Sequence, residues 1–332
     1  MRTRSFYVPT LLSMAVAAAF VVPGDSLTLH VEAKSKLTKT FETRIELAST
    51  SLSITIDGNV ATHGAEAPKI EILDNEKIEV RDEVLSVADG RATVLQRTFV
   101  ALTGDSLHTT SMPEGSAAED QEDKIEKASP LDGKVVVFTW KGDACTAAWA
   151  EGEEGEDELL EKLEVDMDLA GLLPSKPVSD GDTWDLEATL FNKISSPGGR
   201  LRLDDESEGR SEENAAINEE IEKHIEGDGK ATYKGAREVD GVRVGVIEIT
   251  AELESHGTVE SEGGTNTVEY KVRYSGEALW DLEAGHLHSL ELEGKLNLSM
   301  DVSSQVEFDD KSFEMRQKVE FAGEIDHHVT VE

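Results

Sequence analysis

The stretch Leu290–Val331, LELEGKLNLSMDVSSQVEFDDKSFEMRQKVEFAGEIDHHVTV, decides the fold class of this 332-residue chain. Its apolar residues keep to even positions before the Asp309-Asp310 pair and to odd positions after it: Leu290, Leu292, Leu296, Leu298, Met300 and Val302, then Phe313, Met315, Val319, Phe321, Ile325, Val329 and Val331. Successive side chains of a strand leave opposite faces of the pleat, so this alternation predicts one long β-hairpin that turns at Asp309-Asp310. One face of the hairpin is apolar and the other is polar.

The same alternation occupies Leu27–Leu47, and Leu52, Ile54 and Ile56 then fall on even positions before an Asp57-Gly58 turn. Residues 103–128 lack such order and are predicted as a loop. Further strands are predicted at Ile70–Val87, Ala92–Leu102, Val135–Trp140, Thr146–Trp149, Ala231–Ala236, Val242–Leu253, Val268–Tyr274 and Ala278–Leu282. Both ends of the mature chain are thus expected to build one amphipathic sheet system.

Two short helices are predicted between these strands. Glu156–Met167 carries leucines at helical spacing with acidic residues in its first turn. Ser211–Glu226 carries a narrow isoleucine stripe, with Ser211 as the N-cap and Gly227 as the end.

The predicted fold class is therefore mainly β, a long curled antiparallel sheet with two short helices. An unbroken strand of this length would exceed about 60 Å, so it must coil or bend, and Gly294 and Gly323 are the predicted bend or bulge points. Two helices cannot cover that much apolar sheet. The apolar faces must close as a half-barrel, a barrel or a sandwich, or enclose a ligand.

The first 24 residues are predicted as a signal peptide, with Arg2 and Arg4 before the apolar run Tyr7–Val22. Cleavage fits after Ala19 or Gly24, and no cysteine stands there to carry a lipid, so no stable membrane anchor is expected. The mature protein is expected outside the cytoplasm, in the periplasm or secreted. It divides into an N-terminal β half (25–155), a helical and acidic connector (156–227) and a C-terminal β meander with the long hairpin (228–332); one continuous domain over 25–332 is the alternative.

Composition limits the classes of function. A formal net charge of −37 excludes a general nucleic-acid binder, which needs a surplus of Lys and Arg. Weak calcium binding and a saline habitat both remain explanations of the acidity. The single cysteine, Cys145, excludes an intramolecular disulfide and a multi-cysteine zinc site, and is expected to pack beside Ala147 and Trp149.

Gly-Asp-Ser-Leu occurs at 24–27 and at 104–107, and these letters open the nucleophile block of a family of secreted esterases and lipases. In that family the serine follows a strand and a late Asp-x-x-His supplies the base. Here Ser26 precedes a strand pattern, Ser106 falls in a predicted loop, and the nearest late substitute, Glu324-Ile-Asp-His327, lies within a strand. Because a serine without a positioned base is a weak nucleophile, no catalytic residue is assigned.

Two polar patterns resemble metal sites. Asp204, Glu206 and Glu208 before Gly209 mimic the start of a calcium loop, but the twelfth position is Ala215, so a solvated acidic loop is the preferred interpretation. The pairs His286/His288 and His327/His328 are expected at the same end of the sheet, where they could form a surface metal site with Asp326 or Glu324. Without a defined third ligand they are interpreted as polar rim residues, so no metal and no cofactor are assigned.

Leu172-Leu173-Pro174, Val178, Gly181-Asp182 and Trp184 form an LLPxxxVxxGDxW pattern, preceded by Ser-Pro-Leu-Asp-Gly-Lys at 129–134. This combination resembles a motif in uncharacterised secreted bacterial β-rich proteins, and the resemblance covers the middle and C-terminal parts of the chain. It implies an exported envelope protein and transfers no functional residues.

The function expected from the sequence is that of a non-enzymatic envelope protein whose curled sheet binds an apolar small molecule, such as a lipid, or a protein partner. Bacterial lipoprotein carriers have such curled sheets, which is an analogy of architecture alone. One alternative is a secreted hydrolase that uses Ser26 or Ser106. Another is an outer-membrane β-barrel, although the predicted strands exceed the roughly 9–11 residues that spanning needs and aromatic residues make up only 5% of the chain.

Overall fold

The computed structural model describes residues 24–63, 67–203, 210–261, 264–308 and 311–332. Thirteen strands form one antiparallel sheet that is not closed, in the order β7-β6-β4-β3-β1-β13-β12-β11-β10-β9-β8, with β2 paired to β1 and β5 to β4. The strands are β1 (Lys36–Ile56), β2 (Asn59–His63), β3 (Lys69–Ala88), β4 (Arg91–Ser111), β5 (Gln121–Ala128), β6 (Val135–Lys141), β7 (Ala144–Trp149), β8 (Thr183–Leu186), β9 (Glu226–Val239), β10 (Val242–Ser261), β11 (Gly264–Asp281), β12 (Leu287–Phe308) and β13 (Lys311–Val331). The predicted fold class is confirmed.

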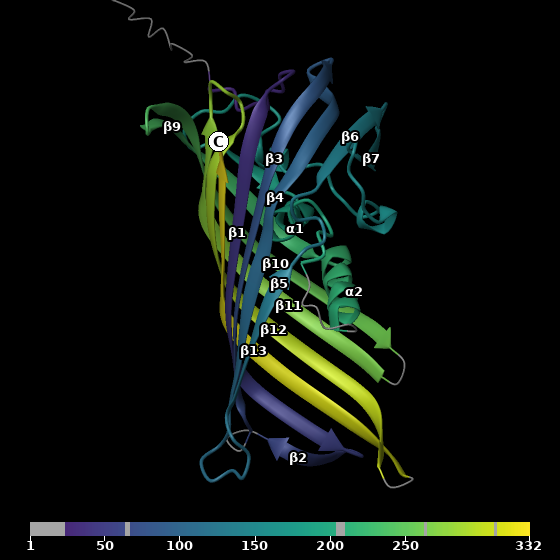
Figure 1. Ribbon diagram of the computed structural model, residues 1–332. Helices are drawn as coiled ribbons and strands as arrows, with labels where there is room; N and C mark the ends of the chain where they lie inside the picture. The colour runs from purple at the N-terminus through teal and green to yellow at the C-terminus, as the bar shows by residue number, and fades with distance from the viewer. Residues whose placement is uncertain (1–23, 64–66, 204–209, 262–263, 309–310) are drawn as a thin grey trace, which may run out of the picture.

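The long hairpin is β12 and β13, which pair from Ser289 opposite Thr330 to Phe308 opposite Lys311. Its predicted turn at Asp309-Asp310 lies outside the described residues. β13 also pairs with β1 along almost its whole length, so the two ends of the sequence meet in the middle of the sheet (Figure 1). The predicted signal peptide falls on residues 1–23, outside the described residues, and on Gly24. The three predicted segments contribute strands to one sheet, and the domain boundaries stay a prediction.

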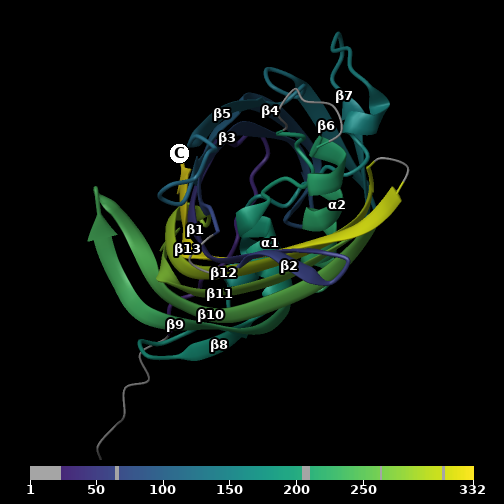
Figure 2. The ribbon, with the colours of Figure 1, turned by 90° about the horizontal axis from the view of Figure 1, so that it is seen from below.

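The sheet curls around α1 (Ala188–Ser195) and α2 (Arg210–Lys223), which lie on its inner face (Figure 2). The ring of Phe191 on α1 stacks on Tyr274 of β11, with ring centroids 5.6 Å apart. The β1–β3 pairing ends where Ala48 stands opposite Glu71, and beyond this point, in the lower part of Figure 1, the sheet divides into two arms. In one arm β3 pairs with β4 alone. β1 continues beside β13 and β2.

A β-bulge explains the change of phase in β1. The register with β13 shifts between Ser49 and Ser51, so inward side chains are odd-numbered above it and even-numbered below it. Gly294 and Gly323, the predicted bend points, lie in regular register instead. A Cβ on Gly323 would lie 1.8 Å from the Glu46 carbonyl oxygen, so glycine there permits close approach of β1 and β13.

Three other local predictions are wrong. Leu27–Ala33 is not a strand, since β1 begins at Lys36, and residues 103–128 are not a loop, since β4 runs to Ser111 and β5 covers Gln121–Ala128. The segment 156–167 contains only a short 3-10 helix, Asp157–Leu159. The backbone around Leu163 pairs with Gly199 instead: the Glu164 N–H donates to the Gly198 carbonyl at 2.8 Å, and the Lys162 carbonyl accepts from the Arg200 N–H at 3.1 Å, whereas a helix would bond both groups within itself.

The helix predicted at Ser211–Glu226 is confirmed as α2, although it ends at Lys223 because Glu226 already belongs to β9. α1 and the 3-10 helix Ala170–Leu172 were not predicted. α1 is eight residues long, too short for its three buried apolar residues, Leu190, Phe191 and Ile194, to show helical periodicity convincingly.

Candidate functional site

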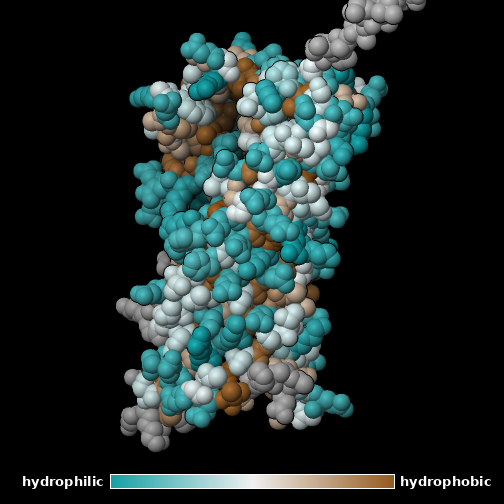
Figure 3. Space-filling view, turned by 180° about the vertical axis from the view of Figure 1, so that it is seen from behind, coloured by the Kyte–Doolittle hydropathy of each residue, from teal (hydrophilic) through white to brown (hydrophobic). Residues whose placement is uncertain are grey.

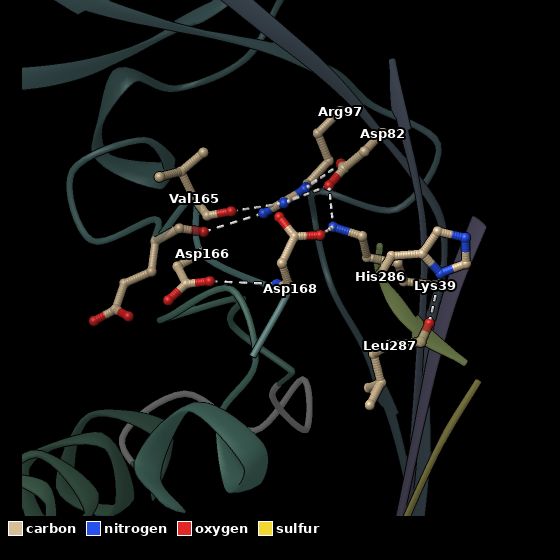
Figure 4. Close-up of polar contacts among 9 residues, drawn as sticks. Lys39, Asp82, Arg97, Val165, Asp166, Asp168, His286 and Leu287 are labelled. Atoms are coloured by element: carbon tan, nitrogen blue, oxygen red, sulfur yellow. Dashed lines mark hydrogen bonds and ion pairs between the residues drawn. The ribbon is translucent and has the colours of Figure 1, made fainter. Parts of the chain in front are cut away.

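The inner face of the curled sheet is the candidate functional site, and its side chains form three levels along the strands. The upper level is an ion cluster of Lys39 on β1, Asp82 on β3, Arg97 on β4 and Asp168 from the connector (Figure 4). Arg97 Nε and Nη2 donate to the two Asp82 oxygens at 2.7 and 2.8 Å. Lys39 Nζ donates to Asp82 at 2.9 Å and to Asp168 at 2.6 Å.

The ion cluster fastens the connector to the sheet. Lys39, Asp82 and Arg97 are 2%, 4% and 0% exposed, so each charge needs its partners. Burial would raise the pKa of Asp82, but Arg97 and then Lys39 outweigh it and hold that pKa well below its usual range. Arg97 also donates to the carbonyl oxygens of Glu164 and Val165, at 3.1 and 2.9 Å. With two cations and two carboxylates the cluster is formally neutral, which suits a structural role.

The middle level, here called the interior belt, consists of polar side chains on the same face: Asp74 and Glu76 of β3, Ser106 of β4, Lys127 of β5, Thr43 of β1, His327 of β13, and Tyr270 and Tyr274 of β11. Lys127 Nζ donates to Asp74 at 2.7 Å and to Glu76 at 2.9 Å. Ser106 Oγ donates to Asp74 at 2.7 Å. In the sheet register Glu76 stands beside Thr43, and Thr43 beside His327.

A chain of hydrogen bonds continues the belt toward β11. Thr43 Oγ1 is 3.0 Å from His327 Nδ1, and His327 Nε2 is 3.2 Å from the Tyr274 hydroxyl, which is 3.3 Å from the Tyr270 hydroxyl. Burial lowers the pKa of His327 to about 4, so its imidazole is neutral at neutral pH. Burial likewise raises the pKa of both tyrosines, which keep their hydroxyl protons. This half of the belt is therefore uncharged.

The lysine half of the belt keeps its charges. Burial alone would lower the pKa of Lys127, but Glu76 and Asp74 outweigh it and raise that pKa above its ordinary value. The side chains of Lys127, Asp74 and Glu76 are 16%, 21% and 29% exposed. This end of the belt is thus partly exposed to solvent.

The lower level, here called the apolar strip, continues the same face of the same strands below the belt. It comprises Leu52, Ile54 and Ile56 of β1, Ile70 and Ile72 of β3, Leu298, Met300, Val302 and Val306 of β12, and Phe313, Met315, Val319 and Phe321 of β13. Exposure rises along it, from 5% at Leu52 and 7% at Val319 to 39% at Val306 and 42% at Ile56.

Both helices lie to one side of the apolar strip. α2 covers β10 and β11, where Ser255 Oγ donates to the Ile221 carbonyl at 2.7 Å, and α1 covers β9 and β11.

Apolar side chains also form a broken stripe down the middle of the molecule when it is seen from behind (Figure 3). The strip is therefore the part of the inner apolar face with the greatest exposure among its described residues.

A groove of about 660 Å³ lies across β5, β3, β1, β13 and β12, and most side chains that line it belong to the outer face. Glu42, Arg44, Lys77, Glu291 and Asp326 are among them, so the lining is charged. Because its shape is open and its walls are ionic, the groove does not suit an apolar ligand.

The structure separates the serines and histidines singled out in the sequence. Ser106 lies in strand β4, not in a loop, and is 4% exposed, while Ser26 is exposed beside the bridge between Asp25 and Val178. His327 points inward, and His328 points outward, 3.9 Å from Glu291. Because neighbouring strand residues face opposite ways, these two histidines lie on different faces of the sheet. His327 is 3% exposed, so its interpretation as a polar rim residue is wrong.

Other polar candidates add no site. In the described part of the chain no group of three His, Cys, Asp or Glu side chains is placed to hold a metal ion. The calcium-like pattern that starts at Asp204 lies outside the described residues. Cys145 is exposed on β7, contrary to the expectation that it is packed.

The LLPxxxVxxGDxW pattern builds a structural corner. Trp184 Nε1 donates to the Leu172 carbonyl at 3.0 Å, and Gly181 turns at a φ of +86° while its N–H donates to Tyr233 of β9 at 2.8 Å. Val178 forms a bridge with Asp25. In the preceding motif, Asp132 accepts a hydrogen bond from the Leu102 N–H at 2.8 Å. These contacts explain both motifs without a ligand.

The sequence contains a pattern that could have identified the polar residues of the ion cluster and of the interior belt. Lys39 falls in phase with Phe41, and Arg97 with Leu95 and Phe99, so each charge occupies an inward position of an apolar row. Asp74, Glu76 and Asp82 on β3 and His327 on β13 follow the same rule. A charged residue in phase with apolar neighbours predicts a buried polar cluster, because unpaired burial is costly.

No protein-family profile and no curated protein sequence matches the chain. Among solved structures it is similar to an outer membrane channel from Pseudomonas putida, at 8% identity and a TM-score of 0.22 over 92% of this chain and 98% of that one. A FadL homologue from Pseudomonas aeruginosa gives 8% identity and 0.23 over 93% and 95%, and OccK5 (OpdH) from the same species gives 6% and 0.18 over 89% and 98%. Scores this low carry no argument about this protein. No helix within the described residues has the length and apolarity to cross a bilayer.

Proposed function

We propose that this protein is an exported, non-enzymatic envelope protein that binds an apolar small molecule along the apolar strip. The observation that carries the proposal is the exposure of the strip, which rises to about two fifths at Ile56 and Val306 on a face whose other apolar side chains are mostly buried or half-buried. Soluble proteins rarely leave a contiguous apolar surface open unless it binds something. Export rests on the predicted signal peptide.

The strip suits a flexible hydrocarbon better than a rigid aromatic ligand. Its side chains are mainly aliphatic, with methionines at Met300 and Met315 that adapt to irregular shapes. Covering such side chains contributes roughly 25 cal/mol for each Å² of apolar surface removed from water. The ion cluster and the connector fix the curvature above the strip, so its upper part is preformed.

The test is direct binding. An organic extract of the protein purified from its native host is analysed by mass spectrometry, and an apolar fluorescent dye is titrated into the delipidated protein. We expect a co-purifying lipid, saturable dye binding, and displacement of the dye by that lipid. Absence of both lipid and dye binding would remove the proposal.

A pair of variants locates the site. Val306→Glu places a charge within the strip at a position that is already 39% exposed, so the fold should tolerate it. Val60→Glu is the matched control, because Val60 is 63% exposed on β2 opposite Thr55, on the other face of the sheet. We expect about a tenfold loss of dye affinity in V306E and no change in V60E. Equal effects in the two variants would place binding elsewhere.

A further inference from the structure

We propose that the interior belt is the head-group end of this site and selects amphipathic molecules with a cationic amine head over those with a carboxylate head. The inference rests on the proposed function and names its ligand class. It is carried by the position of the belt, by its excess of carboxylates and by its partial exposure.

The belt and the apolar strip form one continuous surface. On β3 the inward residues read Glu76, Asp74, Ile72 and Ile70 from the belt downward. On β13 they read His327, Ile325 and then the glycine and phenylalanine at 323 and 321. A single chain lying along these strands would thus reach polar groups at its upper end and mainly apolar side chains below it, with Gln317 as a polar exception on β13.

The charges of the belt do not cancel. Asp74 and Glu76 face one cation, Lys127, whereas the ion cluster above is balanced. The neutral imidazole of His327 adds no positive charge at neutral pH. One level below, beside Ile72 of the strip, His108 and Asp123 stand opposite each other on β4 and β5, so the β4–β5 side of that level adds another carboxylate with one imidazole.

This excess of carboxylates discriminates between head groups. An ammonium group can donate charge-assisted hydrogen bonds to Glu76, whose carboxylate is bound, among the described side chains, only by Lys127. A carboxylate would meet two like charges in a partly dehydrated site. A hydroxyl can donate without carrying charge. The expected order of affinity at neutral pH is therefore amine, alcohol, acid.

The experiment compares dodecylamine, dodecanol and dodecanoic acid as competitors of the bound dye, at a salt concentration of about 0.5 M that screens attraction to the acidic surface. We expect the amine to compete about tenfold more strongly than the acid, with the alcohol between them. Glu76→Gln should reduce this ratio about tenfold. Glu79→Gln, on the outer face of the same strand, is the matched control and should leave it unchanged.

Each outcome decides one question. If none of the three competitors displaces the dye, the proposed function fails together with this inference. If all three compete equally, or the acid competes best, the apolar site stands and the head-group assignment is overturned. If the amine is preferred but E76Q behaves as E79Q does, the belt is not the selecting element. Urea unfolding of both variants confirms that they are folded.

Discussion

At the scale of single residues, the inner face is organised by polar groups that occupy apolar positions. Asp82 binds Arg97 through both oxygens, which is the geometry that best offsets the cost of burying charge. The cost of burying His327 is offset differently: its imidazole remains neutral, and its two ring nitrogens form hydrogen bonds with Thr43 and Tyr274. Each of these side chains is tolerated because a neighbouring strand supplies its partner.

His327 gives a pH dependence with a definite sign. Its pKa is about 4 in the folded protein, against an ordinary value of 6.5, so the unfolded chain binds the proton more readily. The contribution of neutral His327 to the free energy of unfolding is complete above about pH 6.5. It falls by about 3 kcal/mol as the pH is lowered toward 4. Urea unfolding of His327→Gln should lack this loss.

His328→Gln serves as the control for that measurement, because His328 lies on the outer face of the same strand. It should retain the full dependence of the wild type between pH 6.5 and 4. A His327→Gln protein whose free energy of unfolding falls as steeply as that of the wild type would contradict the assignment.

At the scale of elements, α1 is the support of the belt. Its Phe191 is 2% exposed and stacks on Tyr274, which in turn contacts His327. α2 has little apolar character and is held over β10 by a hydrogen bond from Ser255. Tertiary packing, rather than helix propensity, therefore fixes both helices.

Phe191→Ala should destabilise the protein by about 3–5 kcal/mol, because it empties the space between α1 and Tyr274. Urea unfolding gives the free energy, and limited proteolysis reports whether the connector loosens. Thr189→Ala, at an exposed position of the same helix, should change stability by less than about 0.5 kcal/mol. Similar losses in the two variants would mean that α1 is not anchored by this stack.

At the scale of the whole molecule, charge opposes the fold. A formal net charge of −37 on 332 residues produces electrostatic self-repulsion, which arises from the sum of all the charges rather than from one pair of like charges. Many of the ion pairs join exposed side chains of neighbouring strands, such as Arg273 with Glu252, and contribute little individually. The open sheet must therefore be held by its apolar inner face against a repulsive exterior.

Salt should consequently stabilise the protein. Raising sodium chloride from about 10 mM to about 1 M shortens the screening length from about 30 Å to about 3 Å, so the free energy of unfolding in urea should rise. Calcium chloride at matched ionic strength separates screening from binding, and additional stabilisation by calcium would reveal specific sites. A free energy that stays constant or falls with sodium chloride would contradict the dominance of self-repulsion.

The sequence by itself determined most of the long strands, the long hairpin and the amphipathic character of the sheet, because alternation is a local property of the pleat. It missed the short strands β2, β5 and β8. It also indicated α2 through its isoleucine stripe. It misassigned residues 156–167, whose leucines pack as an irregular segment, because the backbone around Leu163 forms hydrogen bonds with residues 198–200 in place of those of a helix. The resulting error concerned the local form of the segment, while Leu159 and Met167 are indeed buried.

Only the tertiary structure decided which polar residues meet on the inner face. Lys39 lies 43 positions from Asp82 and 129 from Asp168, and Thr43 lies 284 from His327. Such partners are chosen by strand order and register, which depend on the pairing of β1 with both β3 and β13. The alternation in Leu290–Val331 predicted an apolar face. The curled sheet brings the polar side chains of the belt together within that face, and the apolar strip below the belt stays partly exposed.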